Sequence, residues 1–240
     1  MHKTESLKGK KVVILGGTSG FGLATARAAV QADALVTIAS RTQANVDKAL
    51  AELPDGIAGA TVDVTNGESL KHLFASLNEF DHLVVTAGDA MPAFQPNYEQ
   101  ARQTFEVRFW GAYLAAITAA PHIRAGGSIT LTNGIVAIRP WKGWSVTAAV
   151  AGALESLTRG LALDFAPIRV NAVCAGMVKT PLWSGMSARE RETMYAENAK
   201  KLPTGRIGEP EDIAQTFLYL MQSGFTSGQI IVIDGGAVIA

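Results

Sequence analysis

A glycine-rich turn between an apolar run and a helical segment constrains the fold of this chain more than any other feature. The apolar residues 12–15 precede the sequence Gly16-Gly17-Thr18-Ser19-Gly20-Phe21-Gly22, and helical periodicity follows from Ala24 to Val30. Glycines let the backbone of such a turn approach a phosphate, and the following helix offers unpaired N–H groups and the positive end of its dipole. The spacing GxxxGxG therefore predicts that the turn binds the pyrophosphate of a dinucleotide. The alternative is a turn that uses glycine for its geometry alone.

Strand-like and helical segments alternate along the rest of the chain. Apolar runs predict strands at 12–15, 35–39, 57–64, 81–86, 128–132, 168–173 and 229–233. Helical periodicity predicts helices at 24–30, 43–53, 67–77, 98–123, 146–164, 190–200 and 210–221. Such alternation is typical of a parallel sheet with helices on both faces. We therefore predict one α/β domain over residues 1–240, a Rossmann-like doubly wound parallel sheet of about seven strands, with its ligand at the carboxyl ends of the strands.

Composition excludes several classes of function. The 240 residues have a formal net charge of zero, with 48% hydrophobic and 18% charged residues, so neither a nucleic-acid surface nor a disordered tail is expected. The single cysteine, Cys174, and the four scattered histidines predict neither a disulfide nor a metal site. The polar residues 1–11 lack the apolar core of a signal peptide, and no apolar run approaches the length of a membrane span. These features predict a soluble cytoplasmic protein with no nucleic-acid or membrane partner.

The end of the second predicted strand bears on the choice between NAD and NADP. An acidic residue at this position would hold the ribose hydroxyls of NAD. The chain has Ser40 and Arg41 instead. A hydroxyl and a guanidinium suit a 2′-phosphate, because arginine makes charge-assisted hydrogen bonds to phosphate oxygens. We therefore predict NADP(H) as the cofactor; the alternative is that Arg41 is only a solvated surface charge.

Motifs along nearly the whole length resemble those of the short-chain dehydrogenase/reductase family. They occur in the family's order: the glycine turn, Asp63-Val64, Thr86-Ala87-Gly88, the segments 170–173 and 176–180, and the C-terminal stretches 205–214 and 234–236. The resemblance implies that subunits pair through the long helices into a homodimer or homotetramer. Together with Ser40 and Arg41, it implies these cofactor contacts: Gly16, Thr18, Ser19, Gly20, Phe21, Gly22, Asp63, Val64, Thr86, Ala87, Gly88, Val178 and Thr180.

The positions that carry catalysis in this family are changed in this chain. The family uses a serine after the fifth strand, a tyrosine and a lysine spaced YxxxK on the next helix, and an asparagine on the preceding long helix. Alignment through residues 153–158 places other residues there, in the same order: Gly134, Thr147, Ala151 and Arg108. A threonine hydroxyl is too weak an acid to replace a tyrosine whose pKa is lowered by a lysine. The family's proton-transfer mechanism is therefore not expected here.

Arg108 and Thr147 are the candidate catalytic residues of the altered site. We predict that the Arg108 guanidinium occupies the space of the absent lysine, where it bonds the nicotinamide ribose or a substrate oxygen and stabilises developing negative charge. The alternative is that Arg108 props the two long helices or pairs with a carboxylate. Tyr195, in the lid that the resemblance places at about 181–205, is a further candidate for the proton donor.

Candidate substrate residues lie on three segments near this site. Thr132 and Asn133, at the end of the fifth strand, offer a hydroxyl and an amide, although strand-end turns also use such residues. Trp144 lies near Trp141 before the altered helix, and Trp183 lies in the predicted lid. Indoles around one pocket suit a flat apolar or aromatic substrate. Packing in the core or between subunits is the alternative role for these tryptophans.

Three functions are consistent with these residues. The first is an NADP(H)-binding oxidoreductase with a non-standard active site, which reduces a small apolar or aromatic carbonyl or imine-type substrate that needs little acid help. The second is a non-redox enzyme of the same fold, in which the bound cofactor and Arg108 template a cyclisation, isomerisation or elimination. The third is a catalytically silent NADP-binding protein that acts through a partner.

Overall fold

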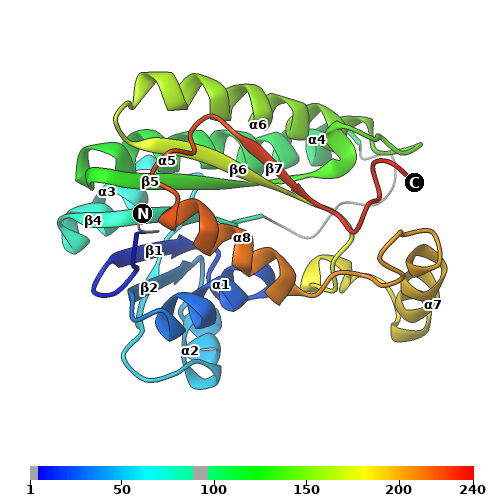
Figure 1. Ribbon diagram of the computed structural model, residues 1–240, viewed down its shortest axis with the longest axis horizontal. Helices are drawn as coiled ribbons and strands as arrows, with labels where there is room; N and C mark the ends of the chain where they lie inside the picture. The colour runs from blue at the N-terminus through cyan, green and yellow to red at the C-terminus, as the bar shows by residue number, and fades with distance from the viewer. Residues whose placement is uncertain (1–4, 89–96) are drawn as a thin grey trace.

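The computed structural model describes residues 5–88 and 97–240, built around a parallel sheet of seven strands in the order β3-β2-β1-β4-β5-β6-β7 (Figure 1). The strands are β1 (Lys11–Leu15), β2 (Leu35–Ser40), β3 (Ala58–Thr61), β4 (Phe80–Val85), β5 (Ile123–Gly134), β6 (Arg169–Ala175) and β7 (Ile230–Ile233). All six neighbouring pairs are parallel. The order reverses between β1 and β4, which is the switch point where ligands bind in such sheets. The predicted fold class is confirmed.

Helices cover both faces of the sheet (Figure 1). One face carries α1 (Gly20–Gln31), α2 (Gln43–Glu52) and α8 (Pro210–Gln222), and the other carries α3 (Gly67–Leu77), α4 (Tyr98–Phe105), α5 (Gly111–Ala119) and α6 (Ser145–Asp164). The remaining helix, α7 (Ala188–Ala199), stands away from the sheet at the end where the C-terminus lies. The predicted lid, 181–205, includes this helix.

Two hydrophobic cores explain why the apolar runs form strands. Phe74, Phe80 and Leu83 belong to the core on the α3–α6 side, while Ile38 and Phe217 belong to the core on the α1–α8 side, and all five are fully buried. Burying a side chain of this size stabilises the fold by about 1.5–3 kcal/mol relative to exposing it.

Cys174 is buried in β6. Burial, with smaller contributions from the carboxylates of Glu155 and Asp234, raises the pKa of its thiol to about 12. The thiol therefore stays protonated at neutral pH, which makes it a poor nucleophile or metal ligand. Its role in the fold is that of a small buried side chain.

The segment 98–123, expected as one continuous helix, is divided in the structure. After α4, the backbone forms a π-helical turn over Glu106–Trp110, before α5 begins and a 3₁₀ turn, Ala120–His122, ends the segment. A π-turn widens the helix locally and is frequent at functional sites. Arg108 is the central residue of this turn, so the irregularity sets the direction of its side chain.

Two further differences from the sequence predictions concern the boundaries of strands. Strand β3 is shorter than 57–64, and β5 begins at Ile123 rather than at Ser128, with a register irregularity opposite Phe80 and His82. Part of the polar N-terminal stretch, residues 1–4, lies outside the described residues.

One described helix, α6, is long and apolar enough to cross a membrane by length and composition. The expectation that no segment approaches that length is therefore wrong by this criterion. A single helix of this kind is a weak indication, because core helices also meet the criterion, and α6 packs on β5 and β6 through buried residues such as Val150 and Leu161.

Candidate active site

The glycine turn is built so that only glycine fits at its key positions. Gly16 has φ +85°, and a Cβ there would lie 2.6 Å from the backbone nitrogen of Ala87. A Cβ on Gly22 would lie 2.2 Å from the carbonyl oxygen of Gly16 and 2.6 Å from the Thr86 hydroxyl. The turn therefore lies flat against the end of β4, which leaves its other side open for a ligand.

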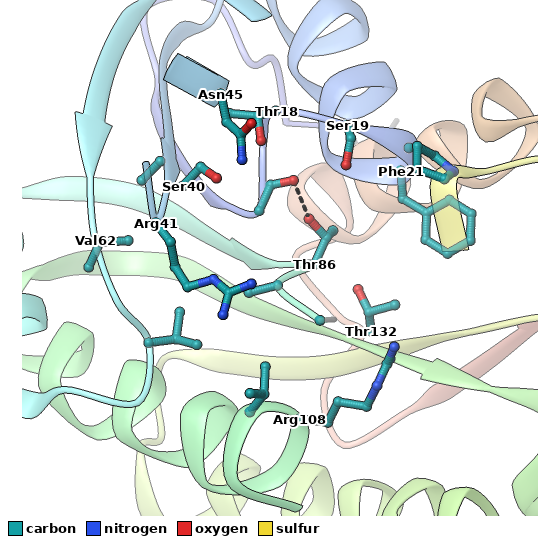
Figure 2. Close-up of a pocket in the computed structure, with 18 of the residues that line it drawn as sticks. Thr18, Ser19, Phe21, Ser40, Arg41, Asn45, Val62, Thr86, Arg108 and Thr132 are labelled. Atoms are coloured by element: carbon teal, nitrogen blue, oxygen red, sulfur yellow. Dashed lines mark hydrogen bonds between the residues drawn. The ribbon is translucent and has the colours of Figure 1, made fainter. Parts of the chain in front are cut away.

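Hydrogen bonds hold this turn at the switch point of the sheet. The Thr86 hydroxyl lies 3.1 Å from the carbonyl oxygens of both Leu15 and Gly16 and donates to them (Figure 2). Ser19, the N-cap residue of α1, makes no side-chain capping bond, and the first turn of the helix contains no acidic residue. No carboxylate of the first turn therefore competes for the first N–H groups of α1, and the cradle fits a dinucleotide pyrophosphate.

A cleft of about 370 Å³ runs along the carboxyl ends of the strands beside this turn. Most of the predicted cofactor residues line it: Gly16, Thr18, Ser19, Gly20, Phe21, Ser40, Arg41, Asp63, Val64, Thr86, Ala87, Gly88 and Thr180. Two predicted contacts do not line it. Gly22 lies beneath the turn, and Val178 is buried, with a backbone bridge to Gly208 and its carbonyl oxygen bonded to the indole N–H of Trp183.

The adenosine end of the cleft gathers polar side chains from three segments. Figure 2 shows Thr18 from the glycine turn, Ser40 from the end of β2 and Asn45 from α2 on one side of the pocket, with the Arg41 side chain reaching across it. Asn45 was missed by the sequence analysis. Its position four residues after Arg41, in the first turn of a helix, was the signal that could have identified it. One carboxylate oxygen of Asp63 accepts hydrogen bonds from both the backbone and the hydroxyl of Thr65.

Arg108 lies at the other end of the cleft, where the nicotinamide end of a dinucleotide would lie. Its guanidinium covers Gly88 so closely that a Cβ there would come within 3.0 Å of its carbon and one of its nitrogens. Figure 2 shows the side chain pointing from its helix toward Thr132. The absence of a side chain at Gly88 therefore lets the charged group rest against the end of β4.

A second, apolar cavity of about 130 Å³ adjoins the cleft. Four residues line both spaces: Phe21, Arg108, Thr132 and Leu182. The cavity is also lined by Gly134, Thr147 and Ala151, so the four residues that the alignment with the family pattern singled out meet in one place. Gly134, Thr147 and Ala151 are small, so they leave space beside the guanidinium of Arg108.

Tryptophans form one wall of the apolar cavity. Trp141 and Trp144 pack edge to face with ring centroids 5.6 Å apart, and Trp183 lies 6.3 Å from Trp144. The indole N–H of Trp183 donates to the carbonyl of Val178 at 3.0 Å, which fixes this ring. The structure brings Trp144 and Trp183 to the cavity with Trp141, as a flat aromatic ligand would require.

The strand-end residues Thr132 and Asn133 also line the cavity, and the Oδ1 of Asn133 is buried without a hydrogen-bond partner among the described residues. The Thr132 hydroxyl donates to the carbonyl of Val85 at 2.8 Å, and the Asn133 amide donates to Glu155 at 3.5 Å. The role of both residues in substrate binding stays a prediction. Arg108 and Thr147 bring a charged group and a further hydroxyl to the same cavity wall.

Tyr195 lies away from this cavity. It is 5% exposed and lines a different depression, with Lys179, Glu192 and Arg206. Burial raises the pKa of its phenol, with a further rise from Glu192 and an opposing effect of Arg191. The hypothesis that Tyr195 replaces the missing acid is not supported, because neither its position nor its pKa suits the role.

No group of three His, Cys, Asp or Glu side chains that could hold a metal ion occurs within residues 5–88 and 97–240.

Comparisons with known proteins agree with this geometry. A family model described as "Enoyl-(Acyl carrier protein) reductase" matches residues 16–238. The short-chain dehydrogenase/reductase ucsE of Acremonium sp is 36% identical over an alignment of 258 positions, and the alignment covers 98% of each chain. This chain belongs to the short-chain dehydrogenase/reductase family. Another member, malC of Malbranchea aurantiaca, is 33% identical over 253 residues, 97% of this chain and 96% of that protein.

Solved structures of family members superpose on the whole chain. A small-chain dehydrogenase in complex with NADPH has 33% identity and a TM-score of 0.81, over 97% of this chain and all of that one. The structure titled "MalC Reductase/Diels-Alderase" has 32% identity and a TM-score of 0.90, over 99% of each chain. Membership in the family shows an oxidoreductase fold that binds a nicotinamide dinucleotide and acts on small molecules.

Proposed function

We propose that this short-chain dehydrogenase/reductase is an NADP(H)-dependent oxidoreductase with a non-standard active site. It reduces a small apolar or aromatic carbonyl or imine-type substrate. One observation carries the proposal: Arg108 and Thr132 line both the dinucleotide cleft and the apolar cavity. A substrate in the cavity would therefore face the reactive end of the cofactor and a fixed cation together.

The preference for NADP(H) rests on the adenosine end of the cleft. Ser40, Arg41 and Asn45 line it, and the end of β2 has no acidic residue. Arginine binds phosphate oxygens through charge-assisted hydrogen bonds, whereas an acidic residue would repel a 2′-phosphate. The related small-chain dehydrogenase in complex with NADPH supports the same choice.

The residues of the chain supply orientation and electrostatics to the reaction. Bound NADPH would supply the hydride. With a carbonyl substrate, the Arg108 guanidinium would stabilise the negative charge that grows on the oxygen as the hydride adds, in a cavity whose apolar walls strengthen the interaction. Thr147 is too weak an acid to donate the proton. Water therefore supplies the proton, and Thr147 only contacts the substrate.

The substrate is proposed to lie between Trp144 and Trp183 on one side and, on the other, the face of α6 that carries the small side chains of Thr147 and Ala151. Trp144 and Trp183 present aromatic surface, and Thr147 with Ala151 leaves open the volume that a tyrosine and a lysine fill in other members. Leu182 and Trp183 begin the segment 181–205, which we propose as a lid over the cavity. A flat ring system fits these walls.

A second candidate is a cyclisation on the same site. It is favoured by the likeness to the structure titled "MalC Reductase/Diels-Alderase", which covers 99% of each chain. In this alternative, the cavity holds a folded substrate, and Arg108 polarises its oxygen without net consumption of cofactor. The third possibility, a silent NADP-binding protein, would keep the cofactor cleft but oxidise no NADPH with any substrate.

The proposed assembly is a homodimer or homotetramer formed through the long helices. Trp110, Ile117 and Leu163 expose 48%, 36% and 81% of their surface on the outer faces of the π-turn, α5 and α6. Exposed large apolar residues on neighbouring helices are typical of interfaces. A cytoplasmic location is likewise proposed from the sequence.

The deciding experiment follows the absorbance of NADPH in the presence of a panel of aromatic carbonyls, conjugated carbonyls and imines. We expect oxidation of NADPH with at least one class. Arg108→Ala should lower turnover about 100-fold or more, the usual effect of removing a group that stabilises a developing oxyanion. Arg108→Lys should retain part of the activity, and Arg102→Ala, an exposed arginine on α4, serves as the control.

Two outcomes would count against this function. Tight binding of NADPH without oxidation by any member of the panel would exclude the reductase. A cyclised product formed while NADPH stays constant would support the second candidate instead.

A further inference from the structure

The loop between β5 and α6 carries an arginine that points away from the cavity. Residues 135–144 of this loop include Ile135, Val136, Trp141 and Trp144, which line the apolar cavity. Arg139 lies among them, yet it is exposed and does not line the cavity. Its contacts therefore bear on the position of the loop rather than directly on a ligand.

The guanidinium of Arg139 binds the turn at the C-terminal end of the chain. Its Nη1 donates to the carbonyl oxygens of Ala237 and Ala240. Asp234 shapes this turn, since its two carboxylate oxygens accept hydrogen bonds from the backbone N–H groups of Gly236 at 2.9 Å and Val238 at 2.8 Å. Figure 1 shows the C-terminus next to the loop that precedes α6.

The same turn, residues 234–240, also packs on the rest of the site. Gly176, which lines the cavity, lies so close that a Cβ on it would be 2.6 Å from the Cα of Asp234. At the end of the proposed lid, the Thr204 N–H donates to the carbonyl of Gly235 at 3.2 Å, and a Cβ on Gly236 would lie 2.5 Å from the Pro203 ring. The C-terminal turn thus contacts Gly176 in the cavity wall and the end of the lid segment. Arg139 connects the same turn to residues 135–144, the tryptophan loop, which carries Trp141 and Trp144.

We propose that Arg139 is a positioning residue that ties the tryptophan loop to the C-terminal turn and so sets the shape of the cavity. Hydrogen bonds from a charged donor are stronger than neutral ones, and two such bonds from one planar group restrict the loop in direction as well as distance. The role in substrate recognition rests on the proposed function, because it requires that the cavity bind a substrate. The tie itself does not.

Hydrogen exchange tests the tie in the full-length protein. In Arg139→Gln, the backbone amides of residues 135–144 should exchange about tenfold faster, the effect of losing one charged hydrogen bond on a local opening equilibrium. Peptides from β5 and from the C-terminal half of α6 should be unchanged. Arg139→Lys should restore part of the protection, and Lys142→Gln, the other exposed cation of this loop, is the matched control. Equal exchange in Arg139→Gln and wild type would overturn the inference.

A second variant covers the case in which Arg139→Gln perturbs more than the loop. Asp234→Ala loosens the turn from its other side, so it should also raise exchange in residues 135–144. If Arg139 acts through the turn, the double variant should exchange no faster than the more affected single variant. Additive effects of the two substitutions would contradict a shared tie.

Ligand binding then tests the consequence for the cavity. The probe is 2-naphthol, a flat aromatic alcohol, added to protein saturated with NADP⁺ and followed by tryptophan fluorescence. Arg139→Gln should bind it more weakly, in proportion to the fraction of molecules in which the loop is ordered. The dissociation constant of NADP⁺ should not change, and Arg139→Lys should recover affinity. Unchanged affinity for 2-naphthol in Arg139→Gln would refute the recognition role, whereas a wild-type protein that does not bind 2-naphthol would count against the proposed function.

Discussion

The dinucleotide cleft and the apolar cavity share four lining residues but are specified in different ways. The cleft is shaped by backbone, because Gly16 and Gly22 admit no side chain without collision. The cavity is shaped by the volumes of side chains from separate elements, with Gly134, Thr147 and Ala151 leaving space and Arg108 adding charge. Substitutions in the cavity can therefore change which substrate binds while the cleft keeps its affinity for the cofactor.

The largest expected effect tests whether backbone geometry alone specifies the cleft. In Gly22→Ala, the added Cβ would collide with the Gly16 carbonyl and the Thr86 hydroxyl, so the turn must shift. We expect a loss of about 1–3 kcal/mol in the free energy of unfolding and about a 100-fold loss of NADPH affinity. Thermal unfolding and a fluorescence titration measure both. Gly160→Ala, on α6 where a Cβ meets nothing within 4 Å, is the control and should be neutral or slightly stabilising. Normal NADPH binding by Gly22→Ala would contradict the steric argument.

The next prediction concerns the polar end of the cleft. Arg41→Ala should weaken NADPH binding by roughly 10- to 100-fold, because hydrogen bonds from a charged group to a phosphate contribute about this much to affinity. NADH binding should be nearly unchanged. Asn45→Ala should produce a smaller change in the same direction. Equal affinities of the wild-type protein for NADH and NADPH would show that Ser40 and Arg41 do not select the cofactor.

The third prediction separates the stability of the sheet from events in either pocket. Burial lowers the pKa of His82 to about 4, against an opposing effect of Asp81, and its ring Nδ1 lies 2.9 Å from the Ser128 hydroxyl. The unfolded chain binds a proton near pH 6.5, whereas the folded chain holds this ring neutral down to about pH 4. Stability should therefore be full above pH 6.5 and fall as the pH decreases toward 4, by about 2 kcal/mol at pH 5.

Chemical unfolding at pH 7 and pH 5 measures this difference, and His82→Gln should reduce it. If His82→Gln keeps the wild-type dependence on pH, other groups are responsible for it.

The smallest expected effect concerns the cavity. Thr147→Ala should change turnover by no more than about twofold, because a threonine hydroxyl is a poor general acid at neutral pH. Arg108→Ala, in the same assay, should produce the large loss described above. A fall of about 100-fold in Thr147→Ala would show that Thr147 donates the proton, and the division of roles between these two residues would then be wrong.

Much of the fold was predictable from the sequence, because the signals are local. The alternation of apolar and amphipathic segments predicted every strand of the sheet, and Leu15 to Gly22 predicted the turn at its switch point. The long helix at 98–123 was predicted as continuous although Gly111 and Pro121 lie within it, and the structure begins α5 at Gly111 and forms the 3₁₀ turn around Pro121. The π-turn at Glu106–Trp110 has no comparable signal in the sequence. The ends of β3 and β5 were also misplaced, since pairing with neighbouring strands decides where a strand stops.

The candidate site was predictable in its residues more than in its contacts. Thr132, Asn133, Trp144 and Trp183 line the cavity as expected, but the hydroxyl of Thr132 and the amide of Asn133 bond within the protein. Asn45 and Arg139 were not identified, because each acts with residues that are distant in sequence or carry no motif. Tyr195 was placed at the site by its segment alone, and the packing of α7 turns it elsewhere.

The sequence by itself determined that the chain forms a dinucleotide-binding sheet, because glycine sterics and hydrophobic periodicity act over a few residues. The tertiary structure alone decided that Gly134, Thr147, Ala151 and Arg108 enclose one cavity beside the cleft. Those residues come from three elements, and only the strand order, the π-turn and the packing of α6 on the sheet bring them together.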